Sequence, residues 1–300
     1  MKQRTVGFIL MSLAALGLAV AATMMKIIPE VTNLGPGDVA IWRFSIAAPV
    51  LWVALFFHQP SERYIPEKPF LLLGLGVVYS IASFSALFAL SRLPASIYVI
   101  LIYIYPALVV LFSILTGRSV PRLSWLGLPL TFIGLFLTSY EFGQALVIDP
   151  IGLAITMVNA LAMATYFLAG ETVFKSTHDR LLGTGWVLTG AMISGLVVIP
   201  VIGAVVPDSL MGWIYLISLS IFGTLMPILA MNYGTQLTGA ARGSVIITLQ
   251  PVLAVIFALI FLNETLSLQQ WIGGSMVVMA IFVIQKSRDR KRRQRQASNP

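Results

Sequence analysis

The chain has 300 residues, of which 58% are hydrophobic and only 10% are charged. A soluble domain carries about 25% charged residues, so this composition excludes a water-soluble globular protein and predicts one surrounded by lipid. Cysteine is absent, which excludes disulfides and thiolate metal sites, and the two histidines, His58 and His178, lie in polar connections. We therefore expect no metal site and no cofactor.

The net charge of +8 comes mainly from KSRDRKRRQR, residues 286–295, near the C-terminus. A basic run directly after an apolar span is typical of a cytoplasmic end. We interpret residues 286–300 as a basic cytoplasmic tail that fixes the orientation of the chain, with contact to anionic lipid as a secondary role. Nucleic acid is not an expected partner.

A helix needs about 20 consecutive apolar residues to cross a bilayer. Ten segments of the chain meet this requirement: 6–25, 39–57, 70–90, 95–116, 123–140, 151–170, 181–202, 213–233, 243–262 and 268–284. The connections between them are short. The sequence therefore predicts an all-α integral membrane protein with ten transmembrane helices and no separate soluble domain.

The distribution of lysine and arginine predicts the orientation of these helices, because cytoplasmic loops carry the excess of both residues. With the N-terminus in the cytoplasm, the cytoplasmic side holds every Lys and Arg except Lys26, Arg43 and Arg92. An even number of spans then returns the C-terminus to the same side. We expect a multi-pass protein of the inner or plasma membrane with both termini cytoplasmic.

The chain resembles itself at a shift of 145 residues. The stretch YVILIYIYPALVVLF, residues 98–112, aligns with SVIITLQPVLAVIF, residues 244–257, and this alignment places Pro106 under Pro251. We interpret residues 1–140 and 150–285 as two five-helix halves. Because five is odd, the second half enters the membrane from the opposite side, which gives an inverted repeat with a binding site between the halves.

The paired prolines indicate two interrupted helices. Pro106 leaves the carbonyl of Ile102 without its helical donor, and Pro251 does the same to Ile247. A freed carbonyl is tolerated in a membrane where it faces a cavity or a partner helix. We therefore expect a hinge or kink at each proline, flanking a shared cavity. Bending for packing alone is the alternative.

Two long stretches of the chain resemble the EamA family of the drug/metabolite transporter superfamily. They are ALFALSRLPASIYVILIYIYPALVVLFSILTGRSVPRLSWLG and NYGTQLTGAARGSVIITLQPVLAVIFALIFLNETLSLQQWIGG. The second stretch carries the family pattern at Ala240, Pro251, Glu264 and Gly273, and VAIWRF resembles the family's second helix, with Arg43 at its arginine. The resemblance implies ten helices, two EamA repeats and export or exchange of a small metabolite.

The chain departs from this family in two places. Arg118 or Ser119 stands where the first stretch would carry an acidic residue, and the first helix has no tryptophan. These departures leave the subfamily and the substrate open.

Three charged residues are candidates for substrate binding or ion coupling. Arg43 lies inside a span, where charge is costly and often functional. Its side chain could bind a substrate carboxylate, but extension to the interface or capping of a neighbouring helix is the reading we favour from sequence. Glu171 and Glu264 lie at helix ends, one per half. Each could act as a proton or ion gate, or be an ordinary exposed carboxylate.

Neutral polar residues at depth form the candidate substrate-binding set. Asn159 and Tyr166 lie seven residues apart and share one helix face, and Tyr98 and Tyr105 are spaced in the same way. The complete set is Tyr79, Ser83, Tyr98, Tyr105, Asn159, Tyr166, Asn232, Thr248 and Gln250. Each side chain could instead be satisfied by another helix. Together they indicate a cavity walled by amide, hydroxyl and aromatic groups, which suits amino acids or similar amphipathic solutes.

An enzyme is the main alternative of a different class. GPGD, residues 35–38, matches the G-x-G-D of intramembrane aspartyl proteases, but that chemistry needs a second aspartate beside Asp38. The other aspartates lie in loops or in the tail, and an acidic residue is common at a helix start. No nucleotide-binding P-loop motif occurs either. A non-transporting scaffold and a channel remain as weaker alternatives.

The sequence therefore predicts a secondary transporter, without catalytic residues, that binds a small molecule and acts as a monomer or homodimer. A multidrug, cation or sugar exporter of the same fold is the nearest alternative.

Overall fold

A computed structural model describes residues 2–58, 65–93, 95–117, 124–139, 149–261 and 267–280, and every regular element in these ranges is helical. In chain order the elements are α1 (Lys2–Val31), α2 (Pro36–His58), α3 (Pro69–Leu90), α4 (Ala95–Ile102), α5 (Tyr105–Leu115), α6 (Ser124–Ser139), α7 (Pro150–Lys175), α8 (Arg180–Ile202), α9 (Leu210–Ser220), the π-helical turn η1 (Ile221–Leu225), α10 (Met226–Thr238), α11 (Ala240–Ile247) and α12 (Leu249–Phe261). Residues 268–280 are also helical.

Seven helical stretches in the described ranges are long and apolar enough to cross a membrane, and two further apolar helices are shorter. The chain is therefore an all-helical, multi-pass membrane protein. The expected count of ten spans stays a prediction, because several of the shorter helices border residues outside the described ranges. The basic tail also lies outside them.

Polar side chains define where several helices begin. Asp149 accepts hydrogen bonds from the backbone N–H groups of the first turn of α7, Asp179 does so for α8, and Ser209 does so for α9. The first N–H groups of a helix have no partner within it, so these caps stabilise the helix starts. Pro150 follows Asp149 at a position where the missing N–H of proline costs nothing.

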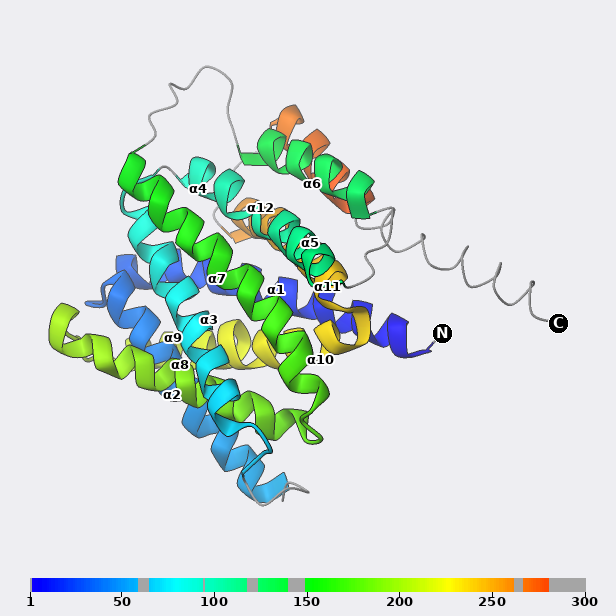
Figure 1. The fold of residues 1–300 in the computed structure, drawn as a ribbon. Helices are drawn as coiled ribbons and strands as arrows, with labels where there is room; N and C mark the ends of the chain where they lie inside the picture. The colour runs from blue at the N-terminus through cyan, green and yellow to red at the C-terminus, as the bar shows by residue number, and fades with distance from the viewer. Residues whose placement is uncertain are drawn as a thin grey trace.

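The two halves contact each other in reciprocal pairs. The helix α1 packs against α10, and its counterpart α7 packs against α3, which runs beside it in Figure 1. Likewise α1 contacts α12 while α7 contacts α5, and the central counterparts α2 and α8 contact each other. This reciprocity is what a two-fold relation between the two halves produces.

Glycines allow a close helix crossing between the halves. A Cβ added to Gly76 of α3 would overlap the carbonyl of Val187 on α8, and one added to Gly190 of α8 would overlap the carbonyl of Leu73. Small residues let membrane helices approach in this way and gain contact without a hydrophobic driving force. The α3–α8 crossing fixes where residues on these two helices can meet.

The structure differs from four of the expected spans. The first helix, expected at 6–25, runs from Lys2 to Val31, because its backbone hydrogen bonds continue past the apolar stretch. The spans expected at 95–116 and 243–262 are each divided into two helices. The span expected at 213–233 contains the π-helical turn η1 between α9 and α10, which packs against α1.

Candidate functional site

Both proline-containing helices are interrupted, and at matching places. The helix α4 ends at Ile102 and α5 begins at Tyr105, while α11 ends at Ile247 and α12 begins at Leu249. The interruption at Tyr103 therefore corresponds to the one at Thr248 under the shift of 145 residues. Each proline follows three residues later, so each break lies where the proline withdraws its hydrogen bond.

The interrupted helices meet each other across the two halves. The Tyr105 hydroxyl, at the start of α5, donates a hydrogen bond to the carbonyl of Ser244 on α11 at 3.2 Å. The Tyr105 ring also stacks on Phe167 of α7, with ring centroids 5.8 Å apart. All three residues are buried. The region around the prolines is thus a contact between halves, built from a hydroxyl, a carbonyl and aromatic rings.

A second set of contacts, here called the central cluster, consists of Arg43, Tyr79, Tyr166, Thr184 and Asn232. The Tyr166 hydroxyl donates to Asn232 Oδ1 at 2.8 Å, and Asn232 Nδ2 donates to the Thr184 hydroxyl at 3.1 Å. The rings of Tyr79 and Tyr166 lie 5.0 Å apart between centroids. These contacts join α3 of the first half to α7, α8 and α10 of the second.

Arg43 is buried at one end of the central cluster. Its side chain is 7% exposed, and its guanidinium interacts with the Tyr79 hydroxyl and lies 4.5 Å from the centroid of the Phe44 ring. Of the two structural roles expected for Arg43, extension to the membrane interface disagrees with this burial, and capping of a neighbouring helix stays a prediction. Extension to the interface was expected because the sequence could not show that α3 covers this face of α2.

Tyr98 and Asn159 form a separate pair. Asn159 Nδ2 donates to the Tyr98 hydroxyl at 2.8 Å and joins α7 to α4. Tyr98 and Tyr105 were expected on one face of a single helix. The interruption between α4 and α5 places them on different helices with different partners, so that part of the prediction is wrong.

The other expected binding residues, Thr248, Gln250 and Ser83, belong to none of these sets of contacts. The Thr248 hydroxyl is fully buried and donates to the Val245 carbonyl at 2.6 Å, which satisfies the helix end at the break. Gln250 Nε2 donates to the Leu18 carbonyl at 3.5 Å and so ties α12 to α1. Ser83 is partly exposed on α3.

Glu171 caps a helix of its own half. One of its carboxylate oxygens accepts a hydrogen bond from the Ala240 N–H at 3.0 Å, at the start of α11, and the other pairs with Lys175 at 2.8 Å. Its side chain is 15% exposed, so it is not the freely solvated carboxylate that the sequence allowed. Glu264 lies outside the described residues.

A further contact between the halves lies at the end of the molecule where α1 ends and α2 begins, here called the distal end. Asp38 Oδ1 accepts from the Val205 N–H at 2.7 Å, Trp42 Nε1 donates to the Val205 carbonyl at 2.7 Å, and Asn33 Nδ2 donates to the Val206 carbonyl at 3.0 Å. We call these side chains and the 205–206 backbone the distal clasp. The second oxygen of Asp38 accepts from Gly35 N–H, so this aspartate caps α2 and holds a loop.

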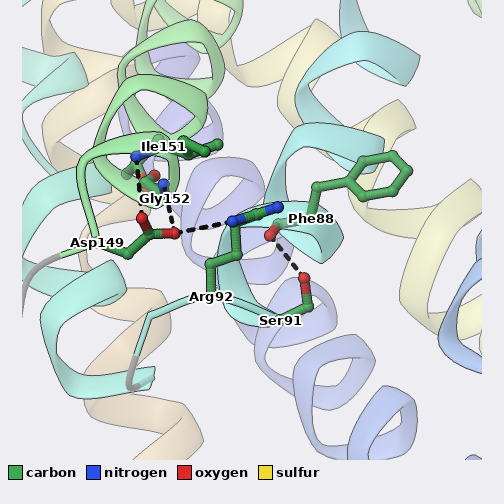
Figure 2. A network of polar contacts seen from close by, with 7 residues as sticks. Phe88, Ser91, Arg92, Asp149, Ile151 and Gly152 are labelled. Carbon is green, nitrogen blue, oxygen red and sulfur yellow. Dashed lines mark hydrogen bonds and ion pairs between the residues drawn. The ribbon is translucent and has the colours of Figure 1, made fainter.

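An ion pair adds to the contact at the distal end (Figure 2). Arg92, just after α3, donates to the Asp149 carboxylate at 3.2 Å, and the same carboxylate caps α7 through the N–H groups of Ile151 and Gly152. The hydrogen bond from Arg92, followed by those two backbone bonds, lowers the pKa of the Asp149 carboxyl. The ion pair is solvent-exposed, so it orients the helix ends more than it stabilises them.

A pocket of about 320 Å³ opens at this same end. It is lined by Pro36, Gly37, Asp38, Phe84, Leu87, Phe88, Ser91 and Gly203, which come from α2, from α3 and its C-cap, and from the segment after α8. None of the expected substrate-binding residues lines it. Among the described residues, no group of three His, Cys, Asp or Glu side chains is placed to hold a metal ion.

Sequence reasoning missed three residues that complete these contacts. Thr184 and Ser244 gave no signal, because a hydroxyl or carbonyl on an apolar helix acquires meaning only from the helix packed against it. Phe167 would have been easier to predict, because it is the chain neighbour of Tyr166 and the two rings contact each other on α7.

Comparisons with known proteins agree with this architecture. A solved crystal structure superposes on the chain with a TM-score of 0.78 at 18% identity, covering 96% of this chain and 98% of the other. Such a likeness shows a shared fold.

Several curated relatives have names that describe transporters. An uncharacterized transporter of Archaeoglobus fulgidus is 26% identical over 71% of this chain and 75% of its own length. A chloroplastic WAT1-related protein of Arabidopsis thaliana is 30% identical over 88% of this chain and 66% of its own length. The uncharacterized inner membrane transporter YedA of Escherichia coli is 24% identical over 80% of this chain and 78% of its own length.

The family comparison covers nearly the whole chain and does so twice. The sequence profile of the EamA-like transporter family matches residues 5–140 and again residues 150–285. With its reciprocal halves and paired interrupted helices, the chain belongs to the EamA-like transporter family.

Proposed function

We propose that this protein is a secondary transporter that exports or exchanges small amphipathic metabolites, amino acids or chemically similar solutes, across the inner or plasma membrane. The observation that carries the proposal is the pair of interrupted helices, one per half, which meet at the Tyr105–Ser244 hydrogen bond. Interrupted helices at the interface of inverted repeats are where carriers bind substrate and where their halves move. The chain moves its substrate by alternating access, with both termini in the cytoplasm.

The substrate class follows from the groups near these breaks. The hydrogen bonds between the halves in this region come from the hydroxyls of Tyr98 and Tyr105 and the amides of Asn159 and Gln250. Arg43 is the single charged side chain among the buried residues in the described ranges. A phosphorylated solute or nucleotide sugar carries two or more negative charges and calls for several Arg or Lys residues. A small solute with one charged group, or a zwitterion, fits this composition better.

Counterflow in proteoliposomes tests the proposal. Vesicles containing purified protein are loaded with unlabelled solutes from a panel of amino acids, organic cations and sugars, and uptake of the labelled solute is followed. We expect saturable exchange for at least one amphipathic solute, with amino acids first. Exchange restricted to cations or sugars would support the related exporter functions instead, and no exchange of any solute would contradict a carrier.

Three variants test the residues assigned to the binding region. N159A, Y98A and Q250A should each lower the exchange rate at least about tenfold while the amount of folded protein is unchanged, because each removes a polar group between helices of opposite halves. T116A is the matched control, since the exposed Thr116 hydroxyl bonds only carbonyls of its own helix among the contacts described. Normal exchange in all three variants would show that the binding region lies elsewhere.

A further inference from the structure

Arg43 is a charged residue in an environment that does not neutralise it. It lies two turns into α2, a helix long and apolar enough to cross the membrane, and its side chain is 7% exposed. A buried guanidinium keeps its charge, and burial without an anionic partner costs several kcal/mol. A side chain this costly needs a role that offsets the cost.

The contacts of Arg43 are weak ones for a group with five N–H donors. One terminal nitrogen lies 3.4 Å from the sulfur of Met25, the ring of Phe44 faces the guanidinium, and the Tyr79 hydroxyl interacts with it. Its Nε has no hydrogen-bond acceptor among the described residues. All of these neighbours are neutral.

No carboxylate of α2 or of the helices packed against it forms an ion pair with Arg43 among the described residues, and Glu30 of α1 is exposed. Asp38, five residues earlier on α2, accepts hydrogen bonds from Gly35 and Val205 in the distal clasp. Asp149 is paired with Arg92. In the described part of the chain no ion pair involves Arg43, so the protein supplies the cation of a pair and not its anion.

We infer that Arg43 is the specificity-determining residue that receives a carboxylate group of the transported solute. This inference rests on the proposed transporter function. The planar guanidinium offers parallel N–H groups that match the two oxygens of a carboxylate, and Nε is one of the donors such a pairing uses. Tyr79 packs on the ring of Tyr166, so aromatic rings adjoin this position and would contact the apolar body of the solute once the halves separate. Arg43 is covered in this conformation, and the solute reaches it when the halves move apart.

The first test needs no ligand and separates this role from a structural one. A buried, unpaired charge kept for binding lowers stability, so replacing it by an apolar side chain of similar length should stabilise the folded state. We expect purified R43M to unfold at the same temperature as the wild type or a few degrees higher. If R43M unfolds several degrees lower, or cannot be obtained folded, Arg43 supports the fold and the inference is wrong.

The second test uses three compounds with one branched aliphatic body. They are L-leucine, 4-methylpentanoate, which lacks the ammonium group, and 3-methylbutylamine, which lacks the carboxylate. At millimolar concentrations both carboxylates should raise the unfolding temperature of the wild type, and the amine should not. R43M should respond to none of them, and R43K should need at least about tenfold more carboxylate, because an ammonium lacks the paired donors.

The control is R92Q, which removes an exposed arginine from its ion pair with Asp149 and should respond like the wild type. Equal protection by the amine, equal protection by inorganic phosphate, an unchanged response of R43M, or no protection of the wild type by either carboxylate would each overturn the inference. Counterflow distinguishes the two proposals. If R43M exchanges a carboxylate solute at the wild-type rate, the proposed transporter function stands and the role of Arg43 is contradicted. If the wild type binds carboxylates but exchanges none of them, the proposed transporter function is contradicted.

Discussion

Tyr166 and Asn232 show at the scale of single residues how polar groups are accommodated in this apolar chain. Both are buried, and Asn232 uses its amide oxygen for Tyr166 and its amide nitrogen for Thr184. A buried hydroxyl that loses its partner costs about 1–3 kcal/mol. N232L should therefore lower the unfolding temperature of the purified protein, and Y166F added to it should recover part of the loss. Strictly additive effects in this double-mutant cycle would mean that the bond contributes nothing.

Asp149 gives a prediction with a defined pH direction. Its pKa is lowered in the folded protein, so its contribution to stability is present above the unfolded value, close to 3.8, and is lost as pH falls through the lower folded value. D149N should be less stable than the wild type at pH 7, and the two should converge at pH values below the folded pKa. A difference that persists unchanged at the lowest pH at which both proteins fold would contradict this. Thermal unfolding of both proteins across this range measures it.

At the scale of helices, the two breaks are the features that the sequence predicted most directly. Proline removes a backbone hydrogen bond at a known position, so the interruptions near Pro106 and Pro251 could be predicted from these two prolines and their spacing. The extension of α1 to Val31 could not be predicted, because hydropathy indicates only which residues lie in lipid. The helix itself continues beyond the apolar stretch and ends in the short connection before Pro36. The turn η1 had no signal, since its five residues would also fit an α-helix.

Pro251 provides the prediction at this scale. P251A restores an N–H that can bond to the carbonyl of Ile247 and so favours a continuous helix. We expect P251A to be at least as stable as the wild type but to exchange solute several times more slowly, because the break no longer bends freely. P200A is the control, since Pro200 lies inside α8 at an exposed position. Unchanged exchange in P251A would assign the break to packing alone.

For the whole molecule, the division into two halves could be predicted from the sequence, whereas their contacts could not. The shift of 145 residues predicted which helices correspond. It did not predict that α1 packs on α10 and α7 on α3, because pairing between halves depends on shapes such as the Gly76–Gly190 crossing. For the same reason the candidate site was predicted as a list of residues, and the structure arranges them as separate pairs and clusters.

Alternating access requires the two halves to move relative to each other during transport, so the distal clasp must open. The chain has no cysteine, so a V31C/V206C variant carries only the two introduced thiols, at exposed side chains on opposite sides of the clasp. A short bis-methanethiosulfonate reagent joins them, and dithiothreitol releases them.

The measurement is counterflow through V31C/V206C before cross-linking, after it, and after release, with each single-cysteine variant treated in parallel. We expect exchange to stop in the cross-linked protein, to return on release and to be unaffected in the single-cysteine variants. Exchange at the full rate with the clasp cross-linked would contradict alternating access between these halves.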